Sequence, residues 1–176
     1  MAVAMRFLYS DLNNGVNASV SGASQEMHPA WTMAADVSLY YKQPISLPMG
    51  ESYFGLGFNL SNLGGKMTYD DYVSNFIPAN MRLGVSYELP FDYYNSLTFN
   101  AECNKMLVPT SISKYATNAD THKMTQEEYS SLSSPWGWVH SFCDAPGYFD
   151  DIKNKQVSPF AEEMQEIQWG VGLEYS

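Results

Sequence analysis

Histidine and cysteine are the residues of this sequence best suited to acid–base chemistry or to metal binding. The three histidines, His28, His122 and His140, lie far apart in predicted loops, and only the spacing His140-x-x-Cys143 resembles part of a metal site. A structural zinc site needs four ligands. We therefore expect ordinary loop residues here, with no metal and no cofactor.

Acidic doublets are a second candidate for chemistry, because paired carboxylates serve hydrolases and calcium sites. None lies in an EF-hand pattern, so we expect solvated loop charge at Asp70-Asp71, Glu127-Glu128, Asp150-Asp151 and Glu162-Glu163. Gly64-Gly65-Lys66 lacks the spacing of a phosphate-binding loop and indicates a turn. No serine occupies a G-x-S-x-G elbow. We predict no catalytic residues, and a Ser–His–acid set assembled across strands stays open as an alternative.

Aromatic side chains are concentrated in one stretch, Ser134–Phe149, which holds two Trp, two Phe and one Tyr. Exposed aromatic clusters are typical of protein interfaces. The alternative is that these rings form a small core or a plug within a long loop. We predict a protein-docking surface made by Trp136, Trp138, Phe142, Tyr148 and Phe149.

The composition excludes one large class of partner. The chain of 176 residues has nine Lys and Arg against nineteen Asp and Glu, a net charge of −10, whereas binding a phosphate backbone needs clustered basic side chains. We expect no nucleic-acid partner. Charged residues make up only 16% and aromatic residues reach 15%, although roughly 25% charged residues are usual in soluble domains. This balance indicates apolar surface that faces something other than water.

The elements that must position these residues are strands. Apolar and polar side chains alternate with a period of two, which places them on opposite faces of a strand. The pattern recurs in residues 3–10, 31–42, 53–60, 79–88, 97–104 and 167–175. The ionisable groups of these segments all share the polar face, namely Arg6, Asp36, Lys42, Arg82, Glu88, Glu102 and Glu174.

The connections alternate between long and short, which predicts an all-β, antiparallel up-and-down meander. Those over 11–29, 61–78 and 109–165 are long, whereas those over 43–50 and 90–95 are short and carry turn residues. The longest connection is expected to hold helical turns. A possible capping box at Thr125 and Glu128 predicts one, and Ala145–Ile152 is expected to form another short turn.

Two architectures fit this meander: a soluble sandwich or lipocalin-like barrel, and an outer-membrane β-barrel. The membrane barrel is favoured because small residues dominate the polar face and rings such as Trp31, Tyr41 and Trp169 lie at the ends of the apolar face, as in an aromatic girdle. Trp31 to Tyr41 spans ~33 Å, or roughly 23–25 Å when tilted. The smallest such barrels have about eight strands. We therefore expect a partial transmembrane barrel domain over residues 1–176, an open piece of a larger barrel, with a long loop insertion at 109–165.

Five stretches, in order along the chain, carry a family resemblance: Tyr9–Leu12, Asn59–Tyr69, Phe76–Gly84, Asn104–Thr110 and Ser141–Phe149. Together they resemble the PorV family, the outer-membrane β-barrel components of the type IX secretion system of the Bacteroidetes, which have a FadL-like fold. The stretches span nearly the whole chain. The sequence departs from the family at Cys143, where Ser is expected, and at Lys153–Ala161, which looks like an insertion.

The resemblance implies a fourteen-stranded barrel when complete, with no catalytic residues. Such proteins associate with the translocon barrel SprA, also called Sov. They receive cargo that carries a C-terminal signal domain and shuttle it to the PorU-containing attachment complex at the cell surface. The alternatives are a FadL-type transporter of hydrophobic small molecules, which the charged polar face disfavours, and an outer-membrane lipid hydrolase. The strands are expected to contact outer-membrane lipid, and the long loops to be extracellular.

Overall fold

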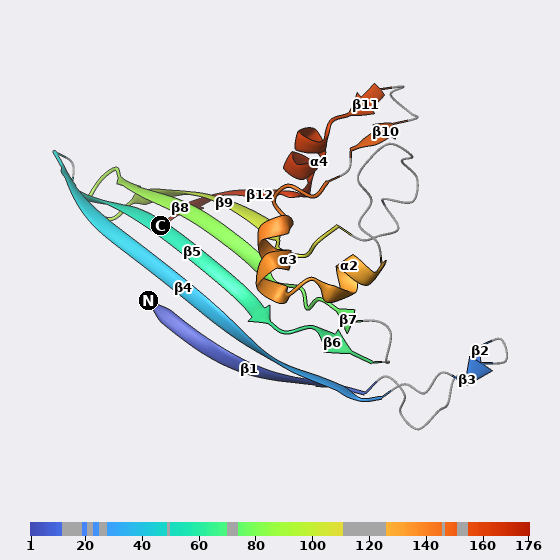
Figure 1. Ribbon diagram of the computed structural model, residues 1–176. Coiled ribbons are helices and arrows are strands. Elements are labelled where there is room, and N and C mark those ends of the chain that lie inside the picture. The colour runs from blue at the N-terminus through green and yellow to red at the C-terminus, as the bar shows by residue number, and fades with distance from the viewer. Residues whose placement is uncertain are drawn as a thin grey trace.

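The computed structural model of the protein describes residues 1–11, 19–20, 23–24, 28–48, 50–69, 74–110, 126–145, 147–150 and 155–176. Six strands form one curved antiparallel sheet in the order β1-β4-β5-β8-β9-β12 (Figure 1). Their bounds are β1 Ala2–Ser10, β4 Ala30–Leu47, β5 Gly50–Gly64, β8 Asn80–Pro90, β9 Ser96–Met106 and β12 Gln168–Tyr175. The predicted all-β meander is confirmed, and the described strands form an open sheet that does not close into a barrel.

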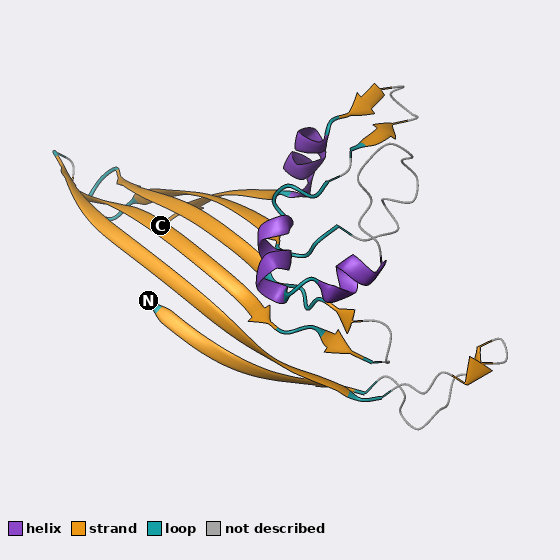
Figure 2. Ribbon diagram, in the orientation of Figure 1, coloured by secondary structure: helices purple, strands orange, loops and turns teal. Residues whose placement is uncertain are grey.

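Short hairpins and helices occupy the connections between these strands. The hairpins pair β2 (Ser19–Val20) with β3 (Ala23–Ser24), β6 (Met67–Thr68) with β7 (Ser74–Asn75), and β10 (Tyr148–Asp150) with β11 (Lys155–Val157). The helices are α2 (Gln126–Ser131), α3 (Ser134–His140) and α4 (Pro159–Glu166). Figure 2 shows them together at one end of the sheet, away from the tight turns. No helix in the described ranges is long and apolar enough to cross a membrane.

The first short connection is shorter than the sequence predicts. A turn is expected over residues 43–50, but β4 continues to Leu47 and pairs Pro44 with Tyr53 of β5. Proline removes a backbone donor and is tolerated mainly where one edge of a strand is unpaired. Because β1 pairs with β4 only as far as Ser38, that edge of β4 has no partner strand within the described residues at Pro44.

The longest connection also differs from the prediction. Helix α2 begins where a helical turn is expected, but Thr125 of the capping box lies outside the described residues. The turn expected at Ala145–Ile152 is wrong, since Tyr148–Asp150 form strand β10 and residues 151–152 lie outside the description. The sequence predicts helical turns in this connection but does not locate α3 or α4. Each helix has only 7 or 8 residues, too few to show an extended apolar period.

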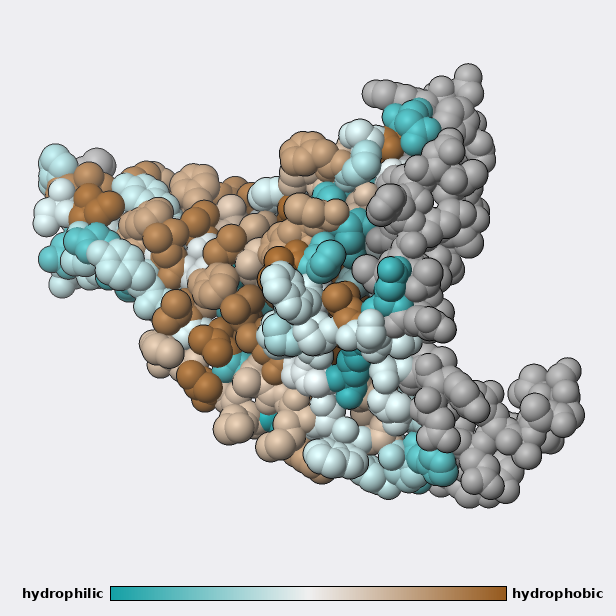
Figure 3. All heavy atoms as spheres, in the orientation of Figure 1, coloured by the Kyte–Doolittle hydropathy of each residue, from teal (hydrophilic) through white to brown (hydrophobic). Residues whose placement is uncertain are grey.

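Large apolar side chains gather on one face of the sheet, here called the apolar face. Figure 3 shows hydrophobic residues over the strands, between more hydrophilic residues at the two ends. Many of these side chains are exposed: Val3, Met5, Phe7, Tyr9, Trp31, Met33, Leu39, Tyr41, Leu56, Leu83, Val85, Phe99, Trp169, Val171, Leu173 and Tyr175. By contrast, the fully buried apolar residues, among those described, are Ala30, Ala34, Ile77, Ala79, Leu107 and Ala145. The sheet itself therefore has no packed layer over its apolar face in the described part of the chain.

A bulge in β5 preserves this division of the two faces. Val37 pairs with Leu60 and Ala35 pairs with Leu63, so two residues of β5 lie opposite Asp36 alone. One of the two, Asn62, has a φ of 57°, a left-handed conformation that asparagine tolerates better than most residues. The extra residue shifts the alternation by one, so that both leucines stay on the apolar face.

Polar side chains from three strands hold the bulge in place. Asp36 Oδ1 accepts a hydrogen bond from the backbone N–H of Asn62 at 2.8 Å, and Arg6 pairs with the other carboxylate oxygen at 2.5 Å. The side-chain amide of Asn62 donates to the Pro78 carbonyl at 3.1 Å. The Asp36 side chain is only 10% exposed. Its charge is compensated on the polar face by Arg6 and by the Asn62 N–H.

Replacing Asn62 by Val should destabilise the protein more than replacing it by Gly. Glycine adopts a positive φ without strain, whereas a β-branched side chain in this conformation should cost about 1–3 kcal/mol. Both substitutions lose the same side-chain hydrogen bonds. The difference in unfolding free energy between the two variants therefore measures the backbone strain of a non-glycine residue at this φ. Urea unfolding of the protein folded in detergent micelles measures it, and equal midpoints for the two variants would contradict the strain argument.

Candidate docking surface at the helical end

Helix α3 buries its glycine and exposes one of its two tryptophans. A Cβ added to Gly137 would lie 2.5 Å from the Phe76 ring and 3.2 Å from the Pro109 ring, so only glycine allows this approach. Ser141, four residues on, is 1% exposed. On the other side, Trp136 is 62% and Val139 is 60% exposed. This is the reverse of the usual amphipathic helix, which turns its apolar stripe toward the core.

Three of the five predicted docking residues come together on α3 and the turn that follows it. Trp136 is exposed, Trp138 is half-buried, and Phe142 is exposed. Tyr148 and Phe149 belong to β10, but their side chains lie outside the described part of the structure. The docking role of the five residues stays a prediction.

A buried ionic cluster fixes α4 beside this surface. The ammonium group of Lys105, a residue that is 4% exposed, lies 2.8 Å from a carboxylate oxygen of Glu163 and 3.1 Å from one of Glu166. Glu163 also accepts the backbone N–H of Ala145 at 2.8 Å. Because each buried charge has a partner, the contacts offset part of the cost of desolvating these groups, and they join α4 to the end of β9.

The Glu162-Glu163 doublet is therefore misassigned by the sequence prediction of solvated loop charge. The two residues are 5% and 9% exposed, and Glu162 accepts the backbone N–H of Gly147 at 2.8 Å. Their burial depends on Lys105, which is far away in sequence and lies beyond the predicted end of its strand at residue 104. The Ser158-Pro159 pair, which caps and starts α4, is the one local signal that could have predicted the helix.

Asp144 makes a further contact between the connecting segments at the helical end of the sheet. Its carboxylate accepts hydrogen bonds from the Thr110 backbone N–H at 2.6 Å and from the Thr110 hydroxyl at 3.1 Å. Burial raises the pKa of Asp144 above its usual range, even though these two hydrogen bonds act in the opposite direction. The contact ties the segment after α3 to the segment that leaves β9.

Lys66 fixes α2 in the same region. Its ammonium group donates to the carbonyls of Tyr129 at 2.9 Å and Ser130 at 3.0 Å, in the last turn of α2. It also lies 4.2 Å from the centre of the Phe76 ring. A cation at the C-terminal carbonyls of a helix is stabilising. Burial lowers the pKa of Lys66. The turn expected at Gly64-Gly65-Lys66 is not formed: Gly64 ends β5, and residues 65–66 connect it to β6.

The remaining candidates for chemistry are dispersed. His28, His140 and Cys143 are exposed, whereas His122 and the Asp70-Asp71 doublet lie outside the described residues. Within the described ranges, no three His, Cys, Asp or Glu residues are grouped to hold a metal ion. The described residues at the helical end therefore offer no cluster for metal binding.

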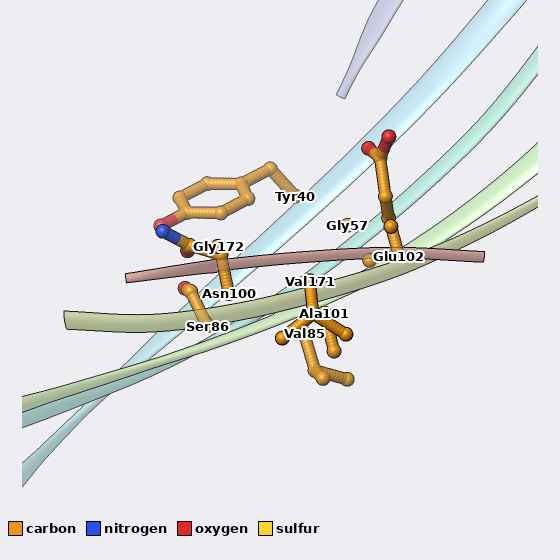
Figure 4. Close-up of a pocket in the computed structure, with 12 residues that line it drawn as sticks. Tyr40, Gly57, Val85, Ser86, Asn100, Ala101, Glu102, Val171 and Gly172 are labelled. Carbon is orange, nitrogen blue, oxygen red and sulfur yellow. The ribbon is translucent and has the colours of Figure 1, made fainter. Parts of the chain in front are cut away.

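The polar face carries a hollow of about 530 Å³ that is lined largely by glycine and small polar residues. Figure 4 shows Tyr40, Asn100 and Glu102 on one side of the strands, whereas Val85 and Val171 point the other way. Glycines at paired positions leave the space open: Gly55, Gly57, Gly84, Gly170 and Gly172. The hollow confirms that the two faces of the sheet differ in size of side chain as well as in polarity.

Comparison with known families gives a match over the first two thirds of the chain. The family described as PorV, type IX secretion system protein PorV, matches residues 1–113. The match spans β1 through β9 and ends before α2. A comparison with curated proteins found no match.

Replacing Lys105 by Met should loosen α4, because the change leaves Glu163 buried without its cation. Removing one partner of a buried ion pair costs about 3–5 kcal/mol. Lys66→Met is the matched control at the same end of the sheet and should leave the exchange of the α4 amides unchanged, because the Lys66 ammonium contacts carbonyls of α2 and the Phe76 ring. Hydrogen exchange of the α4 amides measures the effect. Equal exchange rates in the two variants would contradict the role given to the cluster.

Proposed function

The chain belongs to the PorV family of type IX secretion system proteins, and we propose that it is an outer-membrane β-barrel component that carries cargo from the translocon to the cell-surface attachment complex. In this proposal the cargo is recognised by its C-terminal signal domain, the translocon barrel is SprA (Sov), and the attachment complex contains PorU. The family is one of secretion components and not a known enzyme family. The sheet serves as the membrane anchor, and the helical end carries recognition.

The orientation of α3 is the observation that carries the recognition role. Exposing a large ring to water is unfavourable by about 1.5–3 kcal/mol relative to burying it, and α3 exposes Trp136 and Val139 while it buries Gly137. The neighbouring cluster of Lys105 and Glu163 connects Ala145, in the segment that follows α3, to the end of β9. A partner that covers the exposed rings would recover that energy without reorganising the helix.

The apolar face supports contact with lipid. Exposed apolar side chains follow one another across all six strands, while the charged groups that the sequence assigns to these segments lie on the other face. A contiguous apolar surface of this kind on a monomer marks contact with a partner or a membrane. The aromatic residues Trp31, Tyr41 and Trp169 lie near its two ends, as in a membrane girdle. By the usual rule for such barrels, the long connections and their helices face the cell exterior.

A FadL-type transporter is less well supported than the carrier role. The hollow of the polar face is lined by groups such as Asn100, Glu102 and Ser86, and Arg6 and Asp36 form an ion pair on the same face. These groups favour water or polar ligands over a hydrophobic molecule.

Replacing Val85 by Arg should strongly impair insertion, because Val85 lies on the apolar face near the middle of β8. A charged residue on the lipid face near the bilayer midplane costs about 2–4 kcal/mol. Asn100→Arg is the matched control, since Asn100 points into the hollow of the polar face, and it should cost less than about 1 kcal/mol. Urea titration of folding into phospholipid vesicles measures both. A soluble protein would tolerate the two changes equally well.

Replacing Trp136 by Ala should weaken binding of a purified cargo signal domain. Central aromatic residues of interfaces typically contribute about 2 kcal/mol or more, which corresponds to roughly 30-fold in Kd. Trp169→Ala is the matched control, because Trp169 is 70% exposed on the apolar face of β12, which the proposal assigns to lipid contact. Binding is measured by titration with the protein in micelles, and by recovery of SprA in a pull-down. Unchanged affinity for Trp136→Ala would overturn the docking role of α3.

A further inference from the structure

The tight turn between β8 and β9 carries the most exposed tyrosine rings of the described residues. It comprises residues 91–95 and is called here the Tyr turn. Tyr93 is 92% and Tyr94 is 85% exposed, and Phe91 is 44% exposed. The two tyrosine rings meet edge to face, with their centres 5.1 Å apart. Turn tips are usually polar, so three aromatic residues in five positions require an explanation.

The Tyr turn is held in one conformation by its own hydrogen bonds. Asp92 Oδ1 accepts from the Tyr94 backbone N–H and from the Asn95 side-chain amide, each at 2.8 Å. The Phe91 backbone N–H donates to the Asn95 carbonyl at 2.9 Å. The hydrogen bonds from the Tyr94 N–H, the larger effect, and from Asn95 lower the pKa of Asp92. The rings are therefore presented by a fixed turn, and little conformational entropy is lost when they bind.

The Tyr turn continues the apolar face. Leu89 pairs with Leu97, Leu97 pairs with Tyr175, and the Tyr175 hydroxyl donates to the Asn95 side chain. Tyr175 is an end residue of the apolar face. The turn begins at Phe91, two strand steps beyond Leu89 of the same row, which is ~7 Å along the strand and roughly 5 Å along the membrane normal at a tilt of about 45°. The headgroup layer on each side of a bilayer is roughly 5–7 Å thick. The turn therefore begins within that layer if Tyr175 lies at the edge of the hydrocarbon.

We propose that the Tyr turn is an interfacial anchor, in which Tyr93 and Tyr94 lie among the headgroups of a zwitterionic phospholipid surface and set the depth of this end of the sheet. The proposal rests on the proposed lipid contact of the apolar face. Tyrosine suits this position because its ring is apolar and its hydroxyl is polar. The anchor would act at the end of the sheet opposite to α3.

The charges near the Tyr turn favour zwitterionic headgroups over anionic ones. Among the described residues at this end of the sheet, the acidic groups are Glu51, Glu88, Asp92 and Glu174, and the basic group is Lys42. A surface with this excess of negative charge is repelled by anionic lipid. The ammonium group of a phosphatidylethanolamine headgroup carries the complementary charge.

The depth of the Tyr turn can be measured with a nitroxide label. The complete protein, with Cys103→Ser, Cys143→Ser and Phe91→Cys, is labelled and folded into vesicles of phosphatidylcholine and phosphatidylethanolamine. Collisions of the label with oxygen and with a water-soluble nickel chelate give its depth. We expect a headgroup depth, and a shift of about 3 Å toward water when Tyr93→Ser and Tyr94→Ser are added. The conservative pair Tyr93→Trp and Tyr94→Trp should keep the original depth.

Three results would overturn the anchor. The first is a label in bulk water before the tyrosines are changed, and the second is a depth that the two serine substitutions leave unchanged. The third is protection of the label in native membranes but not in vesicles, which would assign the turn to a protein partner. A second label at Leu83→Cys reports on the apolar face separately. If that label is in water, the proposed membrane role fails, whereas a Leu83 label in lipid with a turn label in water contradicts the anchor alone.

Discussion

The register of the antiparallel strands is the constraint on which the rest of this molecule depends. Side chains alternate with a period of two, so slipping one strand by a single residue would exchange its apolar and polar faces. The pairings Gly57–Gly84, Gly84–Glu102 and Glu102–Gly170 place one continuous polar-face row across four strands. The same register places large apolar residues on the other side. The bulge at Asn62 is the one shift of register between β4 and β5. It keeps Leu60 and Leu63 on the same face although they are three residues apart.

The helical end is organised by a different kind of interaction. Small residues allow close approach, as at Gly137 against Phe76, and buried charge pairs such as Lys105–Glu163 set the position of α4. By parity Lys105 belongs to the apolar face of β9, and it is accepted there because carboxylates of α4 cover it. Specific polar contacts thus attach the connections to the ends of the strands. The Trp136 ring of α3 stays exposed to solvent.

These two kinds of interaction explain how much could be predicted from the sequence. The strands were predictable because the alternation is local and is repeated over about ten residues at a time. The family resemblance was also readable from stretches such as Asn59–Tyr69, and residues 1–113 match that family. The burial of Glu162-Glu163 was not predictable, because it is determined by a lysine 58 residues away. Likewise, the inversion of α3 depends on Phe76 and Pro109, which its own sequence does not reveal.

The distribution of apolar surface links the fold to its surroundings. Four of the six fully buried apolar residues in the described ranges are alanines, and ordering each residue of a chain costs about 1–2 kcal/mol in backbone entropy. A core of that size offsets little of this cost, whereas the exposed side chains of the apolar face offer far more area at about 25 cal/mol per Å². The free energy that stabilises the sheet must therefore come mainly from whatever covers that face. Under the proposed membrane role, folding of the sheet and its association with an apolar environment are one process, and the ionic contacts at the helical end determine the shape of the connections that remain in water.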